Sequence, residues 1–539
     1  MKIILKIPKI HLTLAIISIS YFLLFVLPNS TASENRQMVA VFEPDESVPL
    51  RYVFDMIKPA DTVKQALINF AFYDYYFYGY PHFVLSALSL LPIKILGSLD
   101  NTALVMVTLR QIVSVLPMII AILMLVHLQT LFRTYKAIIL TVLLFCVPGV
   151  VSNNFWWHPD SLAILFAVLA IFFLNRDNLH FGPDFFLAAV MCGFSAGAKG
   201  IGFYFFLTIF VYLLLGFLEK KIPVGKLLLL GIGFLVSMGA AYLFANPILI
   251  YKGVREQYFS VMREQARLLS SGYEVYYDKG FSAALPVITN YYGSILFILA
   301  GVISCAAGIL KDKNRLLNII ILTWMFPISI QVLWITHFKF QYWLPVALPL
   351  FSSMVIFLPE KIILPKMPRG TSWSKMIQVV PQTAIALLIV IQLGIFINSD
   401  IAQFAHHLNR AKESDSIKFH ELAFNALDPL PDQEMLVYHD VRMYVPPTKY
   451  WKTRARFKIL DYGYIQSQGF DVLLLMQQRL YDYLNPNIQG INPTELEQSK
   501  IFYRDADVGT IEGYQLIFRN QFGLVYVKSE LYDQYFLHK

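Results

Sequence analysis

Apolar segments of bilayer length recur along this chain and constrain its fold more than any other feature. A helix needs about 20 mostly apolar residues to cross the hydrocarbon core. The chain contains 57% hydrophobic and only 15% charged residues, whereas soluble proteins carry roughly 25% charged residues. The sequence therefore predicts a polytopic α-helical membrane protein. The predicted spans are 11–28, 103–127, 137–154, 160–175, 185–198, 201–218, 227–245, 291–310, 316–335, 340–358 and 376–397.

The first apolar run begins after three lysines, Lys2, Lys6 and Lys9. This order is also typical of a secretory signal peptide. However, the run has no clean small-x-small cleavage pattern near Pro28. We therefore expect an uncleaved first helix.

Basic residues between the runs set the predicted orientation, because short cytoplasmic loops carry an excess of Lys and Arg. The segment 82–97 is apolar but short, and Pro92 and Lys94 interrupt it. If it spanned, every later basic loop would lie outside, so we interpret it as a helix at the membrane surface. This gives about eleven spans, a cytoplasmic N-terminus and an extracytoplasmic C-terminus. The inward basic residues after the first run are Arg133, Lys136, Arg176, Lys220, Lys221, Lys226, Lys311, Lys313, Arg315, Lys361, Lys366, Arg369 and Lys375.

This topology predicts a transmembrane domain over residues 1–399, with outward segments at about 29–102 and 246–290, and an extracytoplasmic domain over 400–539. In the second domain, strand-like runs alternate with helical stretches such as 401–427. That alternation predicts a small α/β module. The strand-like runs are Met435–His439, Val472–Met476, Leu516–Phe518 and Gly523–Val527.

Composition also excludes several classes of function. The net charge of +8 does not indicate a nucleic-acid partner, because the basic residues form no basic face and topology explains their positions. The cysteines Cys146, Cys192 and Cys305 all lie in apolar runs, so no disulfide framework is predicted. No Walker loop, dinucleotide fingerprint or nucleophile elbow is present.

An acidic cluster lies in the first outward segment, where Glu43, Asp45 and Glu46 precede Arg51. A carboxylate near the bilayer surface can act as a general base or a metal ligand for a membrane-borne substrate. The same residues also suit the first turn of a helix that Pro44 opens. The sequence leaves both interpretations open.

Aromatic residues crowd the segment 73–82, which includes Tyr78 and His82. Such density is typical of an interfacial belt, and ring faces also pack against sugars. In the next outward loop, His158 and Asp160 lie just before a predicted helix. Asp160 and Ser161 can cap that helix, or His158 and Asp160 can share a site.

Three cations are further candidates for a functional site, and two of them, Arg255 and Lys339, are placed where a lipid phosphate could lie. Lys199 lies at the turn between runs 185–198 and 201–218. Joined as one helix, these runs would measure about 51 Å against a core of about 30 Å, so we expect two helices. An ionisable residue in such apolar sequence indicates a functional site or a snorkelling side chain. Arg255 lies on a predicted basic-aromatic surface helix that could hold a lipid phosphate or only contact lipid headgroups. Lys339 precedes a helix entered from outside.

The order of these features resembles the GT-C membrane glycosyltransferases, specifically the branch of protein mannosyltransferases and lipid A aminoarabinose transferases. The resemblance covers roughly residues 10–400 and rests on the order of short motifs. It implies that Asp45 is the catalytic base and that Glu46 is its acidic neighbour. It also implies substrate contacts by His158, Asp160, Lys199, Lys339 and Tyr342. We add Arg51, Tyr78, His82 and Arg255 to the predicted substrate-binding set.

The resemblance implies transfer of a sugar from a polyprenyl-phosphate donor to an acceptor on the extracytoplasmic face. The acceptor class, whether protein, lipid or glycan, stays open, and a divalent metal is compatible with the chemistry. Two departures from the family pattern concern the donor phosphate. Tyr80-Pro81-His82 replaces a charged residue before a Pro-Pro pair, and Val48 stands where an Arg is expected. Arg51 or Arg255 could replace that Arg.

Two other functions compete with the transferase. A transporter or flippase of a lipid-linked saccharide would place ionisable residues within its helices and show inverted repeats. A catalytically inactive member of the family could instead serve as a scaffold for envelope assembly. The polar candidates gather in outward loops, which favours the enzyme.

Overall fold

A computed structural model describes residues 9–310, 314–358, 373–456 and 458–537. These residues form two compact units, each assembled from separate stretches of the chain. The first unit comprises Met1–Ser30, Leu50–Gln265 and Lys279–His407, and the second comprises Thr31–Pro49, Ala266–Asp278 and Leu408–Lys539. Of the residues used for orientation, Lys2, Lys6, Lys311, Lys313, Lys361, Lys366 and Arg369 lie outside the described residues.

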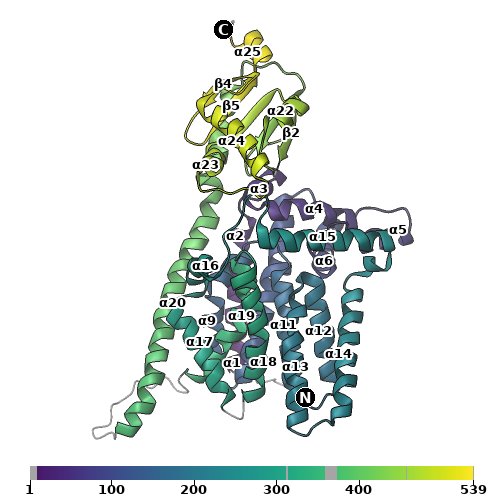
Figure 1. Cartoon of the computed structure of the whole chain (residues 1–539), viewed down its shortest axis with the longest axis vertical. Coiled ribbons are helices and arrows are strands. Elements are labelled where there is room, and N and C mark those ends of the chain that lie inside the picture. Colours follow the sequence, from purple (N-terminus) through teal and green to yellow (C-terminus); the bar gives the residue numbers. More distant parts are fainter. Residues whose placement is uncertain (1–8, 311–313, 359–372, 457, 538–539) are drawn as a thin grey trace, which may run out of the picture. The chain divides into compact units, whose positions relative to one another are not determined.

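The first unit is a helical bundle whose long helices lie side by side (Figure 1). Each predicted span is helical, as expected for long apolar runs bounded by polar loops. The helices are α1 Lys9–Leu24, α2 Val26–Ser30, α5 Val63–Ala71, α6 Tyr80–Ile95, α7 Thr102–Leu109, η1 Arg110–Val115, α8 Leu116–Thr130, α9 Lys136–Phe145, α10 Pro148–Asn154, α11 Asp160–Asp177, α12 Pro183–Lys199, η2 Ile201–Phe205, α13 Phe206–Leu218, α14 Val224–Phe244, η3 Pro247–Ile250, α16 Phe281–Tyr292, α17 Ile295–Ile309, α18 Arg315–Ile330, η5 Gln331–Ile335, α19 Phe340–Ser352 and η6 Ser353–Ile356.

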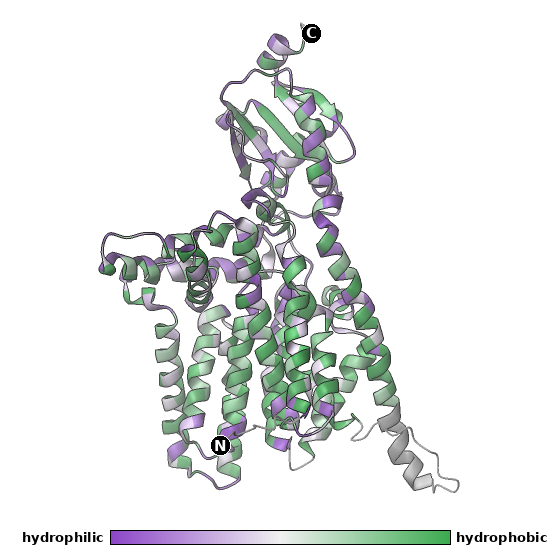
Figure 2. Ribbon diagram, turned by 180° about the vertical axis from the view of Figure 1, so that it is seen from behind, coloured by the Kyte–Doolittle hydropathy of each residue, from purple (hydrophilic) through white to green (hydrophobic). Residues whose placement is uncertain are grey.

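Within the described part of the chain, six helices are long and apolar enough to cross a membrane, or up to eight if each of two bent pairs forms one span. Figure 2 shows these helices as mainly hydrophobic. The chain is therefore built as an integral membrane protein. The helices α11, α12 and α19 with η6, predicted as spans, are not among the eight. The count of eleven and the orientation stay predictions.

Three helices contain residues of both units. They are α4 Pro44–Met56, α15 Lys252–Ser271 and α20 Trp373–Glu413. Figure 1 shows α15 running across the long helices instead of along them. It is the expected basic-aromatic helix, with Arg255 exposed and Tyr258 buried.

The second unit contains the predicted α/β module. Its five-stranded sheet has the order β2-β1-β3-β5-β4. β1 is parallel to β2 and β3, whereas β5 is antiparallel to β3 and β4. The elements are α3 Arg36–Phe42, α21 Asp415–Ala426, β1 Met435–Asp440, β2 Trp451–Arg456, α22 Tyr462–Gln468, β3 Val472–Met476, α23 Gln477–Leu484, α24 Pro493–Val508, β4 Tyr514–Arg519, β5 Gly523–Lys528 and α25 Ser529–Tyr535.

Alternating side chains of the central strand β3 enter two separate cores, one on each face of the sheet. Leu473 packs with Phe502 on one face, and Leu474 packs with Phe419 on the other. This period of two is the expected consequence of the pleat. β2 was not predicted because its polar sequence has no apolar strand pattern. It lies at an edge of the sheet, where a strand pairs with one neighbour and needs few apolar side chains.

Candidate active site

The start of α11 and the end of α12 bring a carboxylate and an ammonium together. Asp160 is the first residue of α11, and Lys199 is the last residue of α12. Lys199 Nζ donates to Asp160 Oδ1 over 2.5 Å, and their side chains are 15% and 1% exposed. Gly200, with φ of +72°, ends α12 in the left-handed conformation that glycine adopts without strain. The two-helix interpretation of this segment is therefore correct.

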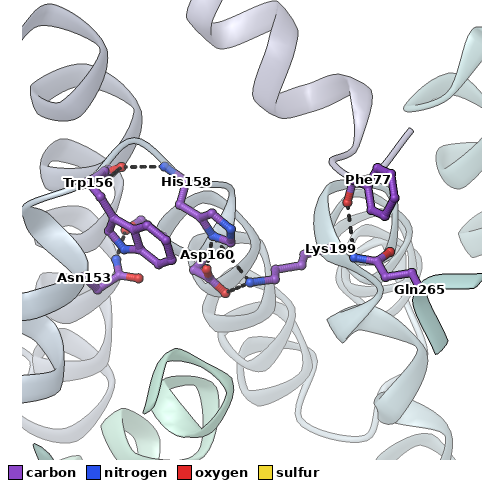
Figure 3. A network of polar contacts seen from close by, with 9 residues as sticks. Phe77, Asn153, Trp156, His158, Asp160, Lys199 and Gln265 are labelled. Atoms are coloured by element: carbon purple, nitrogen blue, oxygen red, sulfur yellow. Dashed lines mark hydrogen bonds and ion pairs between the residues drawn. The ribbon is translucent and has the colours of Figure 1, made fainter. Parts of the chain in front are cut away.

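His158 completes this ion pair from the loop before α11. Its Nδ1 contacts Asp160 Oδ2 and lies 3.4 Å from Lys199 Nζ (Figure 3). Pro159 occupies the cap position of α11 and makes no side-chain capping bond. Asp160 lies in the first helical turn, where the helix dipole favours a negative charge. Its two oxygens nevertheless bind His158 and Lys199, so it does more than begin a helix.

Aromatic rings surround the ion pair. Tyr342 lies under Lys199, with Nζ 5.0 Å from the ring centroid. The Tyr78 ring meets His158 edge-on at 4.7 Å, and Trp156 stacks on His158 at 4.4 Å. His82 joins this group through an edge contact with Tyr78 at 5.5 Å. The structure thus gathers six predicted binding residues, namely Tyr78, His82, His158, Asp160, Lys199 and Tyr342.

A close backbone crossing holds the aromatic segment 73–80 in place. Gly79 N donates to Ala198 O over 3.1 Å, one residue before Lys199. A Cβ on Gly79 would lie 1.6 Å from Gly197 O, so a larger residue cannot occupy this crossing. Tyr73, Tyr76 and Tyr78 of this segment are buried in the protein. An interfacial belt facing lipid therefore does not describe these three residues.

Several buried polar atoms around the cluster have no hydrogen-bond partner among the described residues. They are both ring nitrogens of His82, both amide atoms of Gln111, Oδ1 of Asn153 and Nε1 of Trp156. Asn153 belongs to the same region because its Nδ2 donates to Ser161 Oγ over 2.7 Å. Buried polar groups in proteins nearly always have partners. Their concentration here indicates a place for waters or a polar ligand.

Sequence reasoning missed Gln111, Ser114 and Trp156. Ser114 Oγ donates to Trp156 O over 2.7 Å and accepts from His158 N over 3.3 Å. Gln111 and Ser114 lie in the π-helix η1, a distortion that often marks functional sites. The adjacent polar residues Arg110 and Gln111 within the apolar run 103–127 were the available sequence signal.

The remaining predicted cations occupy other positions. Arg51 is exposed on α4 and lies 3.9 Å from Asp55 on the same helix. Arg255 is exposed on α15. Lys339 is the residue before α19 and is half-buried. It lies one turn before Tyr342, so it belongs to the same end of α19 as the ring under Lys199.

The acidic cluster belongs to the second unit, where its three carboxylates differ in environment. Pro44 opens α4 with Asp45 and Glu46 in the first turn, as the helix-start interpretation predicts. Glu43 pairs with Arg410 at 2.6 Å, and Glu46 is fully buried. Asp45 is exposed. It is therefore the carboxylate of the three most accessible to a substrate.

Metal binding was left open by the sequence. Among the residues that the structure describes, no group of three or more His, Cys, Asp or Glu side chains is arranged to hold a metal ion. A divalent metal thus stays a prediction that rests on resemblance. Cys146, Cys192 and Cys305 are free thiols, in keeping with their positions in apolar runs.

Comparison with solved structures identifies the fold. No protein-family model matches the chain, and no curated protein matches its sequence. ArnT from Cupriavidus metallidurans, bound to undecaprenyl phosphate, matches with a TM-score of 0.50 and 11% identity over 96% of this chain and 97% of ArnT. The oligosaccharyltransferase AglB from Archaeoglobus fulgidus, in complex with an inhibitory peptide and a dolichol-phosphate, gives 0.45 and 13% identity over 93% and 79%. The chain thus shares the fold of ArnT.

Proposed function

We propose that this protein is a membrane glycosyltransferase that moves a sugar from a polyprenyl-phosphate donor to an acceptor on the extracytoplasmic face. The observation that carries the proposal is the buried group of Lys199, Asp160 and His158, found in a fold shared with ArnT. The ArnT structure itself contains undecaprenyl phosphate, the leaving group that such a donor releases.

Lys199 is the proposed contact to the donor phosphate. Negative charge builds up on the phosphate as the bond to the sugar breaks, and a pre-oriented cation stabilises it. Asp160 and the Tyr342 ring fix the direction of the Lys199 side chain, so little reorganisation is needed. Lys339, one turn before Tyr342, supplies a second positive charge. Arg51 and Arg255 are proposed to contact the outward-facing side of the lipid phosphate.

Asp45 is the proposed general base, with Glu46 as its acidic neighbour. The base removes the acceptor proton while the acceptor atom forms a bond to the anomeric carbon. The bond between that carbon and the phosphate oxygen breaks, and the lipid phosphate leaves with the electron pair. Asp45 is favoured over Glu43 and Glu46 because it alone of the three is exposed, whereas Glu43 already neutralises Arg410.

The sugar is proposed to lie against Tyr78, His82 and Trp156. Saccharides present many hydroxyl groups, and the unpaired atoms of His82, Gln111 and Trp156 supply both donors and acceptors. Aromatic faces beside these atoms suit the apolar C–H faces of a sugar ring. The identity of the sugar and of the acceptor is left open by these contacts.

The test compares purified wild-type protein with Asp45→Asn, using radiolabelled polyprenyl-phosphate sugars and an acceptor extract. Loss of a general base typically costs about 10²- to 10⁴-fold in rate, so Asp45→Asn should bind the donor but transfer at least about 100-fold more slowly. Asp61→Asn, which removes another exposed carboxylate from the same predicted outward segment, is the matched control. Full transfer by Asp45→Asn would exclude Asp45 as the base.

A transporter of lipid-linked saccharide is the second candidate, because Arg110 is fully buried within the span Thr102–Thr130. Its Nη1 donates to Asn29 O over 2.7 Å, which also suits a structural role. Reconstituted vesicles distinguish the two functions. Donor movement across the bilayer without sugar transfer would support the transporter and contradict the enzyme.

A further inference from the structure

The short helix α5 of the first unit exposes apolar side chains, although its 9 residues are too few to cross a bilayer. Val63 and Leu67 are 78% and 65% exposed, and Ile68 is exposed as well. Exposed residues follow one another from position 61 to position 68, so this part of α5 projects from the bundle. Apolar side chains gathered at such a place indicate an interaction surface.

The apolar side chains of α5 gather on one side of the helix. Val63, Leu67 and Phe70 occupy positions i, i+4 and i+7, which lie along one stripe of an α-helix. Gln65 and Asn69 lie on the other side, where Gln65 Nε2 donates to Asn69 Oδ1 over 2.8 Å. The helix is therefore amphipathic, and Val63, Leu67 and Phe70 form its apolar stripe.

The neighbouring span α14 shows where the lipid begins. Its 21 residues measure about 31 Å, which matches a hydrocarbon core of about 30 Å. Its last residue, Phe244, is 76% exposed, as expected for a side chain that faces acyl chains. We therefore expect the boundary between acyl chains and head groups to lie at the end of α14 marked by Phe244.

Contacts within the first unit hold α5 close to this end of α14. Phe72 directly follows α5, and its ring lies 5.2 Å from the ring of Tyr251. Tyr73 OH donates to Asn246 Oδ1 over 3.4 Å, and both side chains are buried. Figure 1 shows α5 at the same end of the long helices as α15. Because Ile250 and Tyr251 are exposed, apolar surface continues from α14 toward α5.

We propose that α5 docks on the surface of the phospholipid bilayer and inserts its apolar stripe at the boundary between head groups and acyl chains. Short amphipathic helices bind bilayers in this position. Lys64, at the border of the stripe, extends its ammonium toward the head groups, and Gln65 lies on the side turned away from the acyl chains. Lipid is favoured over a protein partner because α5 is held where α14 meets the bilayer. The proposal is independent of the proposed transferase activity.

The test compares the depth of two positions of α5 in the full-length protein, reconstituted in phospholipid nanodiscs. Leu67→Cys places a thiol on the apolar stripe, and Gln65→Cys places one on the polar side. The native free thiols Cys146, Cys192 and Cys305 are first replaced by serine or alanine, and the single new thiol is labelled with an environment-sensitive fluorophore. Lipids with a nitroxide near the head group should quench the label at position 67 at least threefold more than the label at position 65.

Equal quenching at the two positions would overturn the proposal. A label at position 67 that is shielded from water but not quenched by lipid would identify a protein contact, such as a second copy of the chain, and would also overturn it.

A second comparison uses protein that retains its native cysteines, in case the labelled variants do not fold. Leu67→Ser should raise the hydrogen-exchange rate of the α5 amides in nanodiscs at least threefold, because it removes a side chain of the apolar stripe. Ile68→Ser is the matched control, since Ile68 is an exposed apolar residue of the same helix that lies off the stripe. It should change the rate less than twofold, and equal effects of the two substitutions would contradict the proposal.

Discussion

The ammonium of Lys199 lies 5.0 Å from the centroid of the Tyr342 ring, although the two residues come from distant helices, α12 and α19. Asp160 holds the same ammonium from a third helix, α11. Because three helices meet at one cation, its position depends on their packing. Changes at this cation should therefore affect both stability and donor recognition.

Lys199→Met should destabilise the protein by about 3–5 kcal/mol, since it leaves the buried Asp160 carboxylate without its cation. The double variant Lys199→Met with Asp160→Asn should recover much of that loss while donor turnover stays low. Arg176→Met is the matched control, because it breaks an exposed pair with Asp184 on the same two helices and should cost at most about 1 kcal/mol. The free energy of unfolding of the three variants is measured by titration with a denaturing detergent. Equal losses for Lys199→Met and Arg176→Met would contradict the prediction.

Gly79→Ala should displace the aromatic segment from the end of α12. The added Cβ would lie 1.6 Å from the backbone oxygen of Gly197, so backbone must move, at a cost of about 1–3 kcal/mol. Donor affinity should fall as well, because Tyr78 adjoins this crossing. Gly239→Ala on α14, where an added Cβ meets nothing within 4 Å, should leave the thermal midpoint unchanged. A Gly79→Ala protein with normal stability and activity would show that the crossing is not required.

His82→Phe separates binding from folding. A phenyl ring preserves the stack on Trp157 but removes two nitrogens that have no partner among the described residues. Stability should therefore stay the same or rise, because no hydrogen bond is lost and a desolvation cost disappears. If the sugar bonds to His82, kcat/KM for the donor should fall about tenfold, equivalent to about 1.4 kcal/mol. Unchanged kcat/KM would remove His82 from the binding set.

Glu274 should make docking of the segment 266–278 within the second unit sensitive to pH. Tyr276 N donates to Gln489 O, and Ile491 N donates to Glu274 O, each over 2.9 Å. Burial raises the pKa of Glu274 above its ordinary value of 4.5. Hydrogen bonds from Ile459 and Tyr483 lower the pKa, but their effect is smaller than that of burial. The raised pKa means that the folded state binds this proton more tightly than the unfolded state does. The stability that protonated Glu274 contributes is therefore present at low pH and is lost as pH rises through the folded-state pKa.

Hydrogen exchange checks this linkage. After correction for intrinsic rates, the amides of Tyr276 and Ile491 should be better protected near pH 4 than at pH 7. Glu274→Gln should abolish the difference, whereas Glu495→Gln, an exposed carboxylate of the same unit, should preserve it. Protection that does not vary with pH in the wild-type protein would refute the role of Glu274.

The sequence by itself determined where the long apolar helices of the first unit lie, because apolar runs of bilayer length favour helices wherever they occur. It also determined four of the five strands, whose apolar residues fill the cores of the sheet. β2 escaped prediction because an exposed edge strand requires few apolar residues. The pairing of His158 with Asp160 could be predicted from the sequence, since only one residue separates them.

Tertiary structure decided which of the polar candidates meet. Lys199 reaches Asp160 because α11 and α12 pack together, and Tyr342 reaches Lys199 only through the placement of α19. Tertiary contacts likewise distinguish Asp45 from Glu43, because Glu43 forms an ion pair with Arg410. Local patterns report burial and helix period, but ion pairs between distant segments depend on how whole helices pack. The sequence therefore identified the candidate residues, and the fold decided which of them lie together.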